Sequence, residues 1–379
     1  MTRAHPLLTA LAVTLLVGVT AALATLSRET PGTARWQTLG QLDEPRALAT
    51  TVSLPDGDVL VVGGLDNDDP RVVRTTVEIV DPFTGKTRVL PQRLLGRVNH
   101  TATLATGGAV VMAGGTERIG PQWSALDRVE VYDPARETWT IAANMNDARS
   151  DHGAAALRDG RVLVAGGTDG PRQLDSVEIY DAAANTWTPA HPLPEARSQF
   201  SIATLNDGRV LVAGGLVRGE ASSSSVIYDP ARDAWDQGPR MQVARVLNAS
   251  VKLSSGDVLL IGGQRDGGGT AERYDARTKR FVFAGTLVQP RMLGAAVRIP
   301  DGRVLVVGGL LIDPGRSSFV PLADAEIWDQ TTDRWTDVSD PFTARALGSF
   351  VLTPAGALWI GGAGEGEHAL RSIERFTWR

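Results

Sequence analysis

Histidine and carboxylate side chains at repeated positions are the first candidates for chemistry in this sequence. His100 and His152 each follow an arginine by three residues, and Asp151 directly precedes His152. Two imidazoles and a carboxylate can bind a transition metal, and a neutral imidazole can act as a general base. A repeated histidine also serves local hydrogen bonding. We therefore assign no metal and no catalytic residue here, and keep the three residues as binding candidates.

Several other chemistries are excluded by composition. The 379 residues include no cysteine, which rules out disulfides, thiolate metal sites and cysteine nucleophiles. No G-x-S-x-G nucleophile motif occurs, and the acidic stretch 65–70 lacks the glycine and distal glutamate of a calcium loop. We expect no cofactor. The net charge of −5, without a Lys/Arg-rich run, makes nucleic acid an unexpected partner.

Arginine and glutamate recur together along the chain. The arginines are Arg46, Arg97, Arg149, Arg197, Arg245, Arg291 and Arg345, and the glutamates are Glu78, Glu130, Glu178, Glu272, Glu326 and Glu374. Opposite charges on neighbouring strands stabilise each other, so this pattern predicts a structural ladder of ion pairs. Val226 occupies the glutamate position of the fourth unit, which leaves Arg197 as a candidate anion site.

All these residues belong to one long repeat. The sequence DGRVLVAGG occurs at 159–167 and again at 207–215, and seven Gly-Gly doublets recur every 46 to 53 residues. A period of this length indicates a repeat architecture. The step from each arginine to its doublet is 17 residues in six units and 16 in the last, which predicts one rigid hairpin. Asp-Gly between two apolar runs predicts a type I′ turn.

Two further strands complete each unit. A run such as RVEVYD at 128–133 predicts a third strand, and an aromatic residue such as Trp139 marks a fourth. The first unit has Thr87 or Arg88 in place of that aromatic, and the last unit ends before a fourth strand. The segment around Trp36 matches the missing strand. Seven four-stranded sheets arranged radially form a β-propeller, so we predict an all-β ring over residues 36–379, with its last sheet completed by the N-terminal strand.

An arginine, a Gly-Gly doublet, a tyrosine and a tryptophan at these spacings resemble the kelch repeat, and the resemblance covers roughly residues 33–379. It implies a seven-bladed kelch-type β-propeller, as in the central domain of galactose oxidase-like copper enzymes. Those enzymes use two histidines, two tyrosines and a cysteine cross-linked to one tyrosine. This chain has no cysteine, and its four tyrosines share one repeat position. That copper radical activity is therefore excluded, and we do not expect an enzyme.

The N-terminus lies outside the repeat. Residues 7–27 form 21 uncharged residues, long enough to span a bilayer as a helix. Ala22-Leu23-Ala24 within them is a site that a signal peptidase could cleave. A cleaved signal and an uncleaved anchor both stay open, and both predict export to the periplasm or the extracellular space. We expect residues 1–27 to be signal or anchor, 28–35 to be a linker and 36–379 to be the propeller.

The connection between the second and third strands (b and c) varies most. From the second glycine of the doublet to the tyrosine position the counts are 16, 17, 13, 13, 11, 19 and 14. Variable loops on a rigid scaffold commonly carry binding specificity, and Trp123 and Phe319 lie in two of them. We predict a binding module for a protein or glycan ligand. The alternative, implied by the kelch resemblance, is a small-sugar enzyme with a central-channel site, similar to sialic acid mutarotases.

Overall fold

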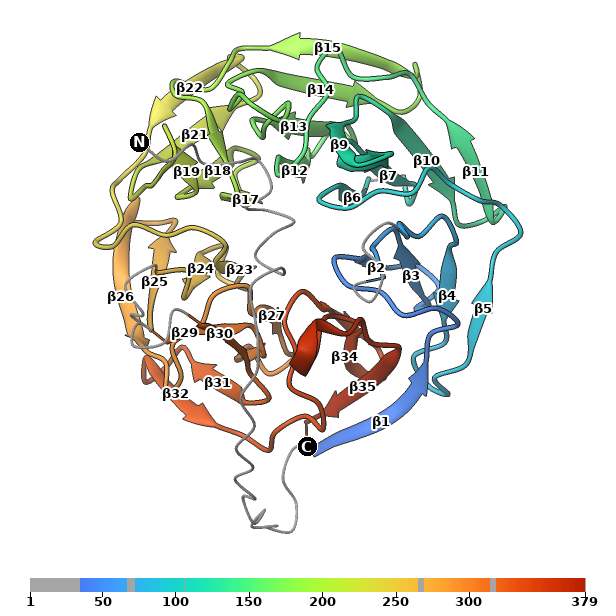
Figure 1. Ribbon diagram of the computed structural model, residues 1–379. Coiled ribbons are helices and arrows are strands. Elements are labelled where there is room, and N and C mark those ends of the chain that lie inside the picture. Colours follow the sequence, from blue (N-terminus) through green and yellow to red (C-terminus); the bar gives the residue numbers. More distant parts are fainter. Residues whose placement is uncertain (1–34, 67–71, 106, 265–268, 314–317, 379) are drawn as a thin grey trace.

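The computed structural model describes residues 35–66, 72–105, 107–264, 269–313 and 318–378. These residues form seven antiparallel four-stranded sheets arranged in a ring around a central axis (Figure 1). The prediction of an all-β propeller is therefore confirmed. The predicted signal or anchor and nearly all of the linker lie outside the described residues. Within the described part of the chain, no helix is long and apolar enough to cross a membrane.

We number the sheets as blades 1 to 7 and name their strands a to d from the axis outward. Their bounds are as follows. Blade 1 contains β2 (Thr50–Ser53), β3 (Val59–Val62), β4 (Glu78–Val80) and β5 (Thr87–Val89); blade 2 contains β6 (Thr101–Leu104), β7 (Val110–Ala113), β10 (Val129–Asp133) and β11 (Thr138–Ile141); blade 3 contains β12 (Gly153–Ala156), β13 (Val162–Ala165), β14 (Val177–Asp181) and β15 (Thr186–Ala190); blade 4 contains β17 (Ser201–Thr204), β18 (Val210–Ala213), β21 (Ser225–Asp229) and β22 (Ala234–Gln237). Blade 5 contains β23 (Ala249–Lys252), β24 (Val258–Ile261), β25 (Thr270–Asp275) and β26 (Arg280–Thr286); blade 6 contains β27 (Ala295–Arg298), β28 (Val304–Val307), β31 (Ala325–Asp329) and β32 (Arg334–Asp337); blade 7 contains β33 (Ser349–Thr353), β34 (Gly356–Ile360), β35 (Ser372–Thr377) and β1 (Arg35–Gln41).

The second strand of every blade is buried along its whole length. Runs such as Val-Leu-Val-Val suit this position because both faces of the strand pack against neighbouring blades. The core therefore consists of clusters that lie between adjacent blades, such as the one joining Leu163 of blade 3 to Val210 of blade 4. Each blade depends on its neighbours for burial of its apolar surface.

The a–b hairpins are present, but the predicted turn type was wrong. In the first hairpin only Gly57 has a positive φ (97°), and Asp56 does not. The Gly57 N–H donates to Leu54 O (3.0 Å), and the Leu54 N–H donates to Asp58 O (2.8 Å). The loop therefore has three residues, with glycine in the left-handed conformation. Such a loop also matches the right-handed twist of the two strands that it joins. The aspartate accepts the Asp58 N–H (3.1 Å), so its side chain stabilises the loop.

The ring is closed by its two terminal strands. β1 pairs with β35 along its length, with Trp36 opposite Phe376. The inner strands contact one another in the order β2, β6, β12, β17, β23, β27 and β33, and β33 contacts β2 again. Trp36 is 7% exposed and packs against Phe376 and Trp359, with ring centroids 5.2 and 6.1 Å away. The same aromatic pairing occurs in other blades, for example Tyr180 with Trp187 at 4.9 Å.

The Gly-Gly doublets join neighbouring blades. The second glycine donates its N–H to the carbonyl of the next blade's repeat arginine, as in Gly64 to Arg97 (3.0 Å), and the series closes with Gly362 to Arg46 (2.7 Å). Both glycines have positive φ, and a Cβ on Gly63 would lie 2.7 Å from Arg97 O. No other residue fits this close backbone approach. The doublet is therefore the contact that sets the spacing between blades.

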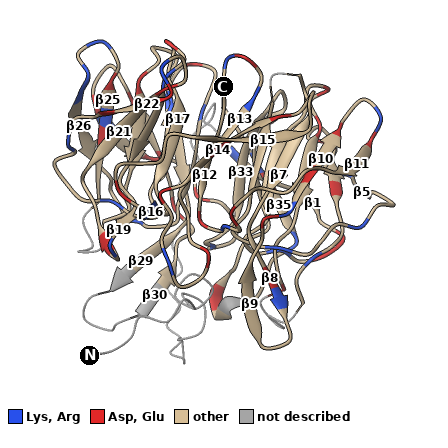
Figure 2. Cartoon of the chain, turned by 90° about the horizontal axis from the view of Figure 1, so that it is seen from above, with Lys and Arg blue, Asp and Glu red and all other residues tan. Residues whose placement is uncertain are grey.

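Short hairpins extend from one end of the ring. They are β8 (Thr116–Ile119) with β9 (Gln122–Ala125), β29 (Leu310–Asp313) with β30 (Ser318–Pro321), and β16 (Arg197–Ser198) with β19 (Leu216–Val217) and β20 (Glu220–Ala221). Figure 2 shows β8, β9, β16 and β19 at one end of the molecule, beyond the four-stranded sheets. All of them belong to b–c connections except β16, which lies in the d–a connection before blade 4. The b–c and d–a connections together form what we call the loop face.

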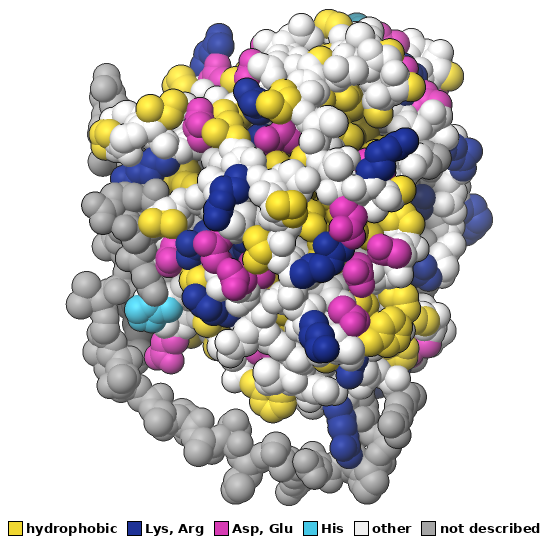
Figure 3. Space-filling model, turned by 90° about the vertical axis from the view of Figure 1, so that its right-hand side faces the viewer, with side chains coloured by type: hydrophobic (Ala, Val, Ile, Leu, Met, Phe, Trp, Pro, Cys, Tyr) yellow, Lys and Arg dark blue, Asp and Glu magenta, His cyan; other side chains and the backbone are white. Residues whose placement is uncertain are grey.

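The outer wall of the ring has a mixed charge. Figure 3 shows acidic and basic side chains interspersed over one side of the molecule. Exposed ion pairs such as Arg88–Glu137 and Arg136–Asp133 lie on the outer part of blades 1 and 2. Such pairs contribute little to stability, and their alternating signs give this wall no single charge that would attract a polyelectrolyte.

Candidate functional site

The predicted arginine–glutamate ladder is present at the loop-face end of the blades. In blade 3, Arg149 is fully buried and its Nη2 lies 2.8 Å from Glu178 Oε1. Its Nη1 donates to Gly166 O (2.8 Å) and Ser176 O (3.0 Å). Ion pairs of this kind occur in six blades: Arg46–Glu78, Arg97–Glu130, Arg149–Glu178, Arg245–Glu272, Arg291–Glu326 and Arg345–Glu374. Burial lowers the pKa of Arg345 to about 10, against the opposing field of Glu374.

Five of the six glutamates, those of blades 1, 3, 5, 6 and 7, also hold the connection that leads into the first strand. In blade 3, Glu178 Oε2 accepts the backbone N–H of Asn146 (2.7 Å). The equivalent bond occurs in blades 1, 5, 6 and 7, from the residue three before the repeat arginine. One carboxylate thus satisfies a guanidinium and a loop N–H at once. The ladder has a structural role, since every pair is buried within its blade.

Blade 4 departs from this pattern in two linked positions. Val226 replaces the glutamate, and the loop donor becomes Pro194, which has no N–H. Arg197 donates instead to Gly214 O (3.3 Å) and Ser224 Oγ (3.2 Å), and no ion pair of its side chain occurs among the described residues. Burial lowers its pKa, and Glu195 opposes this effect. Arg197 is 1% exposed, so a solute would reach it only if the blade opened. Anion binding at Arg197 stays a prediction.

Residues in the left-handed backbone conformation form a ring around the central channel, next to the arginine–glutamate ladder. Two residues after each repeat arginine, φ lies between 53° and 58° at Leu48, Asn99, Asp151, Gln199, Leu247, Leu293 and Leu347. Non-glycine residues in this region are strained, and backbone hydrogen bonds between blades hold them, as in Gln199 N–H to Asp151 O (2.9 Å). The three polar members belong to blades 2 to 4, and the four leucines occupy the remaining arc. We call this ring the channel rim.

Asp151 therefore lies on the polar arc of the channel rim. Its carboxylate is partly buried and accepts a hydrogen bond from Ser150 Oγ (3.3 Å). Burial raises the pKa of Asp151 to about 6, and hydrogen bonds from Ser150 and Gln199 oppose the rise. No ion pair to Asp151 occurs in the described ranges of the chain. A carboxylate in this setting is neutralised more easily than an ordinary surface aspartate.

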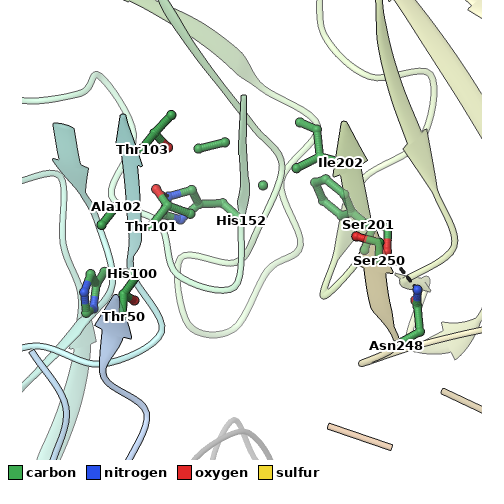
Figure 4. A pocket seen from close by; sticks show the side chains of 13 residues that line it. Thr50, His100, Thr101, Ala102, Thr103, His152, Ser201, Ile202, Asn248 and Ser250 are labelled. Atoms are coloured by element: carbon green, nitrogen blue, oxygen red, sulfur yellow. Dashed lines mark hydrogen bonds between the residues drawn. The ribbon is translucent and has the colours of Figure 1, made fainter. Parts of the chain in front are cut away.

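Both candidate histidines line a pocket in the central channel. The pocket has a volume of about 330 Å³ and takes its walls from the inner strands of blades 1 to 5. His152 Nε2 lies 3.0 Å from Thr101 Oγ1, whereas neither ring nitrogen of His100 has a hydrogen-bond partner among the described residues. Figure 4 shows His152 beside Thr101, with Asn248 and Ser201 on the opposite wall. The two histidines thus share one cavity although they come from different blades.

Burial keeps these imidazoles uncharged. It lowers the pKa of His100 to about 3, with a further contribution from Arg97. It also lowers the pKa of His152 well below the ordinary value, helped by Arg149 and His100. No group of three or more His, Asp or Glu side chains suited to a metal occurs among residues whose placement is described. His100, His152 and Asp151 therefore do not come together as a three-ligand metal site in the described part of the chain.

Of the two loop aromatics proposed as binding candidates, the structure describes the side chain of Trp123 but not that of Phe319. Trp123 is half-buried: it packs against an apolar cluster that includes Ala47 and Val98, and Arg118 lies 5.7 Å from its ring. Packing against neighbouring loops and contact with a ligand were both open for Trp123; the structure shows the packing, and a binding role for Trp123 stays a prediction. Phe319 lies on β30 opposite Ile312, but its side chain is outside the described part of the structure.

Other side chains of the loop face are exposed and apolar. Ten large hydrophobic residues are exposed among the described residues, and five of them lie on b–c or d–a connections: Val72, Ile119, Val288, Val320 and Phe342. On the turns at the opposite end the comparable residue is Phe83 of the c–d turn in blade 1. Sequence reasoning missed these residues because an apolar residue in a loop gives no local sign of its exposure. It also missed Phe200 and Asn248, which occupy the register of His100 and line the same pocket.

The fold and the repeated side chains define a kelch-type β-propeller. The kelch motif matches residues 97–146 and 148–194. Curated relatives include Kelch-like protein terF of Aspergillus terreus, 28% identical over 37% of this chain and 32% of the relative. Kelch-like protein 34 of Homo sapiens is 30% identical over 36% of this chain, and an F-box/kelch-repeat protein of Arabidopsis thaliana is 31% identical over 28% of it. The last two matches cover 22% and 26% of those relatives, so all three span a third of the relative's length or less. The chain is a kelch-repeat protein.

A solved structure shares the whole architecture. A fungal alcohol oxidase of the AA5 family, in complex with copper, superposes with a TM-score of 0.72 over 92% of this chain and 77% of its own, at 18% identity. This likeness shows the fold alone. The copper donors of galactose oxidase-like enzymes do not fit the residues present, since cysteine is absent. Tyr132, Tyr180, Tyr228 and Tyr274 are buried against the outer aromatic of their blades.

Proposed function

We propose that this protein is a binding module whose loop face engages a protein partner. The observation that carries the proposal is the concentration of exposed apolar side chains on that face. Ile119 is 59% exposed and Phe342 is 67% exposed, on a frame otherwise held by buried ion pairs and inter-blade hydrogen bonds. Exposed apolar side chains beside polar ones commonly mark protein contacts. Kelch repeats generally serve protein interactions, in agreement with this assignment.

The rigidity of the frame supports the same role. The ladder and the glycine doublets fix where each connection starts, whereas the length of the b–c connections differs between blades. Binding residues are commonly carried on variable loops over a fixed scaffold. A glycan ligand remains a second candidate for this face, and the sequence and the loop geometry give no observation that favours it over a protein.

We also propose that the module works outside the cytoplasm. The support is residues 7–27, whose uncharged length fits a signal or an anchor. The absence of cysteine is compatible with any compartment. Export would present the loop face to partners in the periplasm or at the cell surface.

Paired substitutions test the binding face. Ile119→Ser and Phe342→Ser should each weaken capture of a partner by the full chain, by about 1–2 kcal/mol if the residue is an interface hot spot. Phe83→Ser is the matched control, because Phe83 is also exposed (62%) but lies at the opposite end. The partner would come from affinity capture, with affinities then measured by calorimetry. Loss of binding in Phe83→Ser, with both loop-face variants unaffected, would assign the function to the other end.

A further inference from the structure

Blade 6 carries more carboxylates at its loop-face end than its repeat arginine can pair. Arg291 Nη2 forms ion pairs with both Asp324 and Glu326. Asp337 ends β32 opposite Glu326, and Asp340 follows in the connection to blade 7. Both residues are exposed, and neither has an ion-pair partner among the described residues. The described part of this end of the blade is therefore acidic.

Asp324 departs from the repeat. Two residues before the ladder glutamate, or before Val226 in its place, five other blades have a hydroxyl side chain: Thr76, Ser176, Ser224, Thr270 and Ser372. The hydroxyl oxygens of the first four accept a hydrogen bond from the repeat arginine of their own blade. A neutral acceptor is thus sufficient at this position, and the ladder does not need the negative charge of Asp324.

The carboxylates at this end of blade 6 repel one another. Partial burial raises the pKa of Asp340, and the negative charges of Asp324 and Asp337 raise it further, against a backbone hydrogen bond at Ala325. Like charges at this range disfavour each other's ionised form. The lysines of the chain all lie beside turns at the opposite end: Lys86, Lys252 and Lys279. A cation brought by a ligand would relieve a repulsion that the described residues leave in place.

Exposed apolar side chains accompany these carboxylates. Val288 and Phe342 hold the same repeat position, three residues before the arginines that open blades 6 and 7, and the exposed Val320 lies on β30 of blade 6. The Val288 N–H donates to Glu326 Oε2 (2.7 Å), and the Phe342 N–H donates to Glu374 Oε2 (2.8 Å). The buried ladder thus fixes the backbone that carries both side chains. Anchors held in place before binding lose little conformational entropy when a partner binds.

Three apolar and three acidic side chains form what we call the blade 6 patch: Val288, Val320, Asp324, Asp337, Asp340 and Phe342. We propose that the blade 6 patch binds a segment of a partner protein in which a lysine or arginine lies next to an apolar side chain. The apolar side chain would pack on Val288 and Phe342, and the cation would pair with Asp337 and Asp340. This inference rests on the proposed loop-face function and adds the position and the charge of the contact.

Other occupants fit the blade 6 patch less well. An acidic segment or a polyanion would be repelled by the carboxylates. A second copy of the chain, bound through a two-fold contact, would place the same acidic side chains against each other. Within the described ranges, the carboxylates of the patch do not converge into a group suited to a metal ion. A basic and apolar protein segment is therefore the ligand that the patch favours.

Selection from a phage-displayed library of random peptides, with the full chain as the target, tests this inference. We expect peptides that bind the wild type but not Phe342→Ser to carry lysine or arginine beside an aromatic or aliphatic residue. A synthetic copy of such a peptide should bind several-fold more weakly at about 1 M than at about 0.1 M salt, because the screening length falls from about 10 Å to about 3 Å.

Charge variants of the chain separate the ion pairs from the apolar contact. Asp337→Asn/Asp340→Asn should weaken binding of the peptide by about threefold to tenfold at the lower salt concentration and reduce its salt dependence. Asp333→Asn is the matched control, because Asp333 is exposed in the same blade but lies on the c–d turn at the opposite end. Its φ of 51° suits asparagine, and this variant should bind like the wild type. Unchanged or higher urea midpoints would show that all these variants keep the fold.

The outcomes distinguish this inference from the loop-face function. Peptides that require Phe342 but carry no cation, or that bind Asp337→Asn/Asp340→Asn as tightly as the wild type, overturn the inference and leave the loop-face function intact. A library without any Phe342-dependent peptide also overturns it, as does a Phe342-dependent dimer in sedimentation, which would assign the patch to a second copy. Peptides and a captured partner that are lost in Phe83→Ser but retained by Ile119→Ser and Phe342→Ser would contradict the loop-face function as well.

Discussion

Blade 4 allows the energetic role of the arginine–glutamate ladder to be measured within one protein. Arg149 and Arg197 occupy equivalent positions and are both buried, but within the described ranges only Arg149 has a carboxylate partner, at 2.8 Å. Methionine at either position keeps an unbranched apolar side chain and removes the charge. The packing loss is therefore similar in the two variants, and the difference reports on the ion pair.

The expected costs differ because of what each substitution leaves behind. Arg149→Met leaves Glu178 buried with backbone donors but no cation, and breaking a buried pair in this way costs about 3–5 kcal/mol. Arg197→Met loses hydrogen bonds to Gly214 O and Ser224 Oγ, worth about 1–2 kcal/mol. It also removes a buried cation whose desolvation opposes folding. We expect a net loss of roughly 0–2 kcal/mol at Arg197.

Urea unfolding of the full chain would measure both variants. The double variant Arg149→Met/Glu178→Met should recover part of the loss of Arg149→Met, because it leaves no buried charge unpaired, although the Asn146 N–H loses its acceptor. Equal unfolding midpoints for Arg149→Met and Arg197→Met, with unchanged denaturant dependence, would refute this reasoning. So would a double variant that is less stable than the sum of its single variants.

Three further predictions concern closure, acid sensitivity and export. Trp36→Ala should lower the free energy of unfolding by about 3–5 kcal/mol, because it empties a buried aromatic site in blade 7; an unchanged urea midpoint would contradict ring closure by β1. Stability should fall as pH drops from about 6 to 4, since unfolding lets the buried histidines take up protons. His100→Gln should reduce the slope of stability against pH by about 1.4 kcal/mol per pH unit, and an unaltered slope would argue against a depressed pKa at His100. Asp151 acts in the opposite direction: its pKa of about 6 in the folded protein means that its contribution is present at low pH and lost as pH rises from about 4 to 6. A fusion of residues 1–35 to a reporter that is active only outside the cytoplasm should be active, and a silent fusion would oppose export.

Much of the frame could be predicted from the sequence because each blade repeats the same local pattern. The constant step from arginine to Gly-Gly fixed the hairpin, and the repeated glutamate placed the ladder. The contacts between blades were less predictable. The left-handed rim residues, such as Leu48 and Gln199, are held by carbonyls of other blades. No sequence pattern marks leucine for that conformation, because propensity disfavours it.

Among the candidate site residues, too, those that follow the repeat could be predicted, whereas those that depend on contacts between blades could not. His100 and His152 were selected by their common register, and the structure places both in one pocket. The packing of Trp123 could not be decided from the sequence, since it depends on Ala47 and Val98 from two different blades. The exposure of Ile119 and Phe342 likewise depends on how far neighbouring loops extend. Residues that act through contacts between repeats therefore need the assembled ring before their roles can be assigned.

Hydrogen exchange on the full chain, with and without a captured partner, tests the loop-face assignment most directly. The account predicts slower exchange in the b–c hairpin β8–β9 and in the d–a connection that contains Phe342 when the partner is bound. The a–b turns at the opposite end, such as the one containing Asp159, should exchange at the same rate in both states. Protection confined to the a–b and c–d turns, with unchanged exchange in β8–β9 and around Phe342, would contradict the assignment.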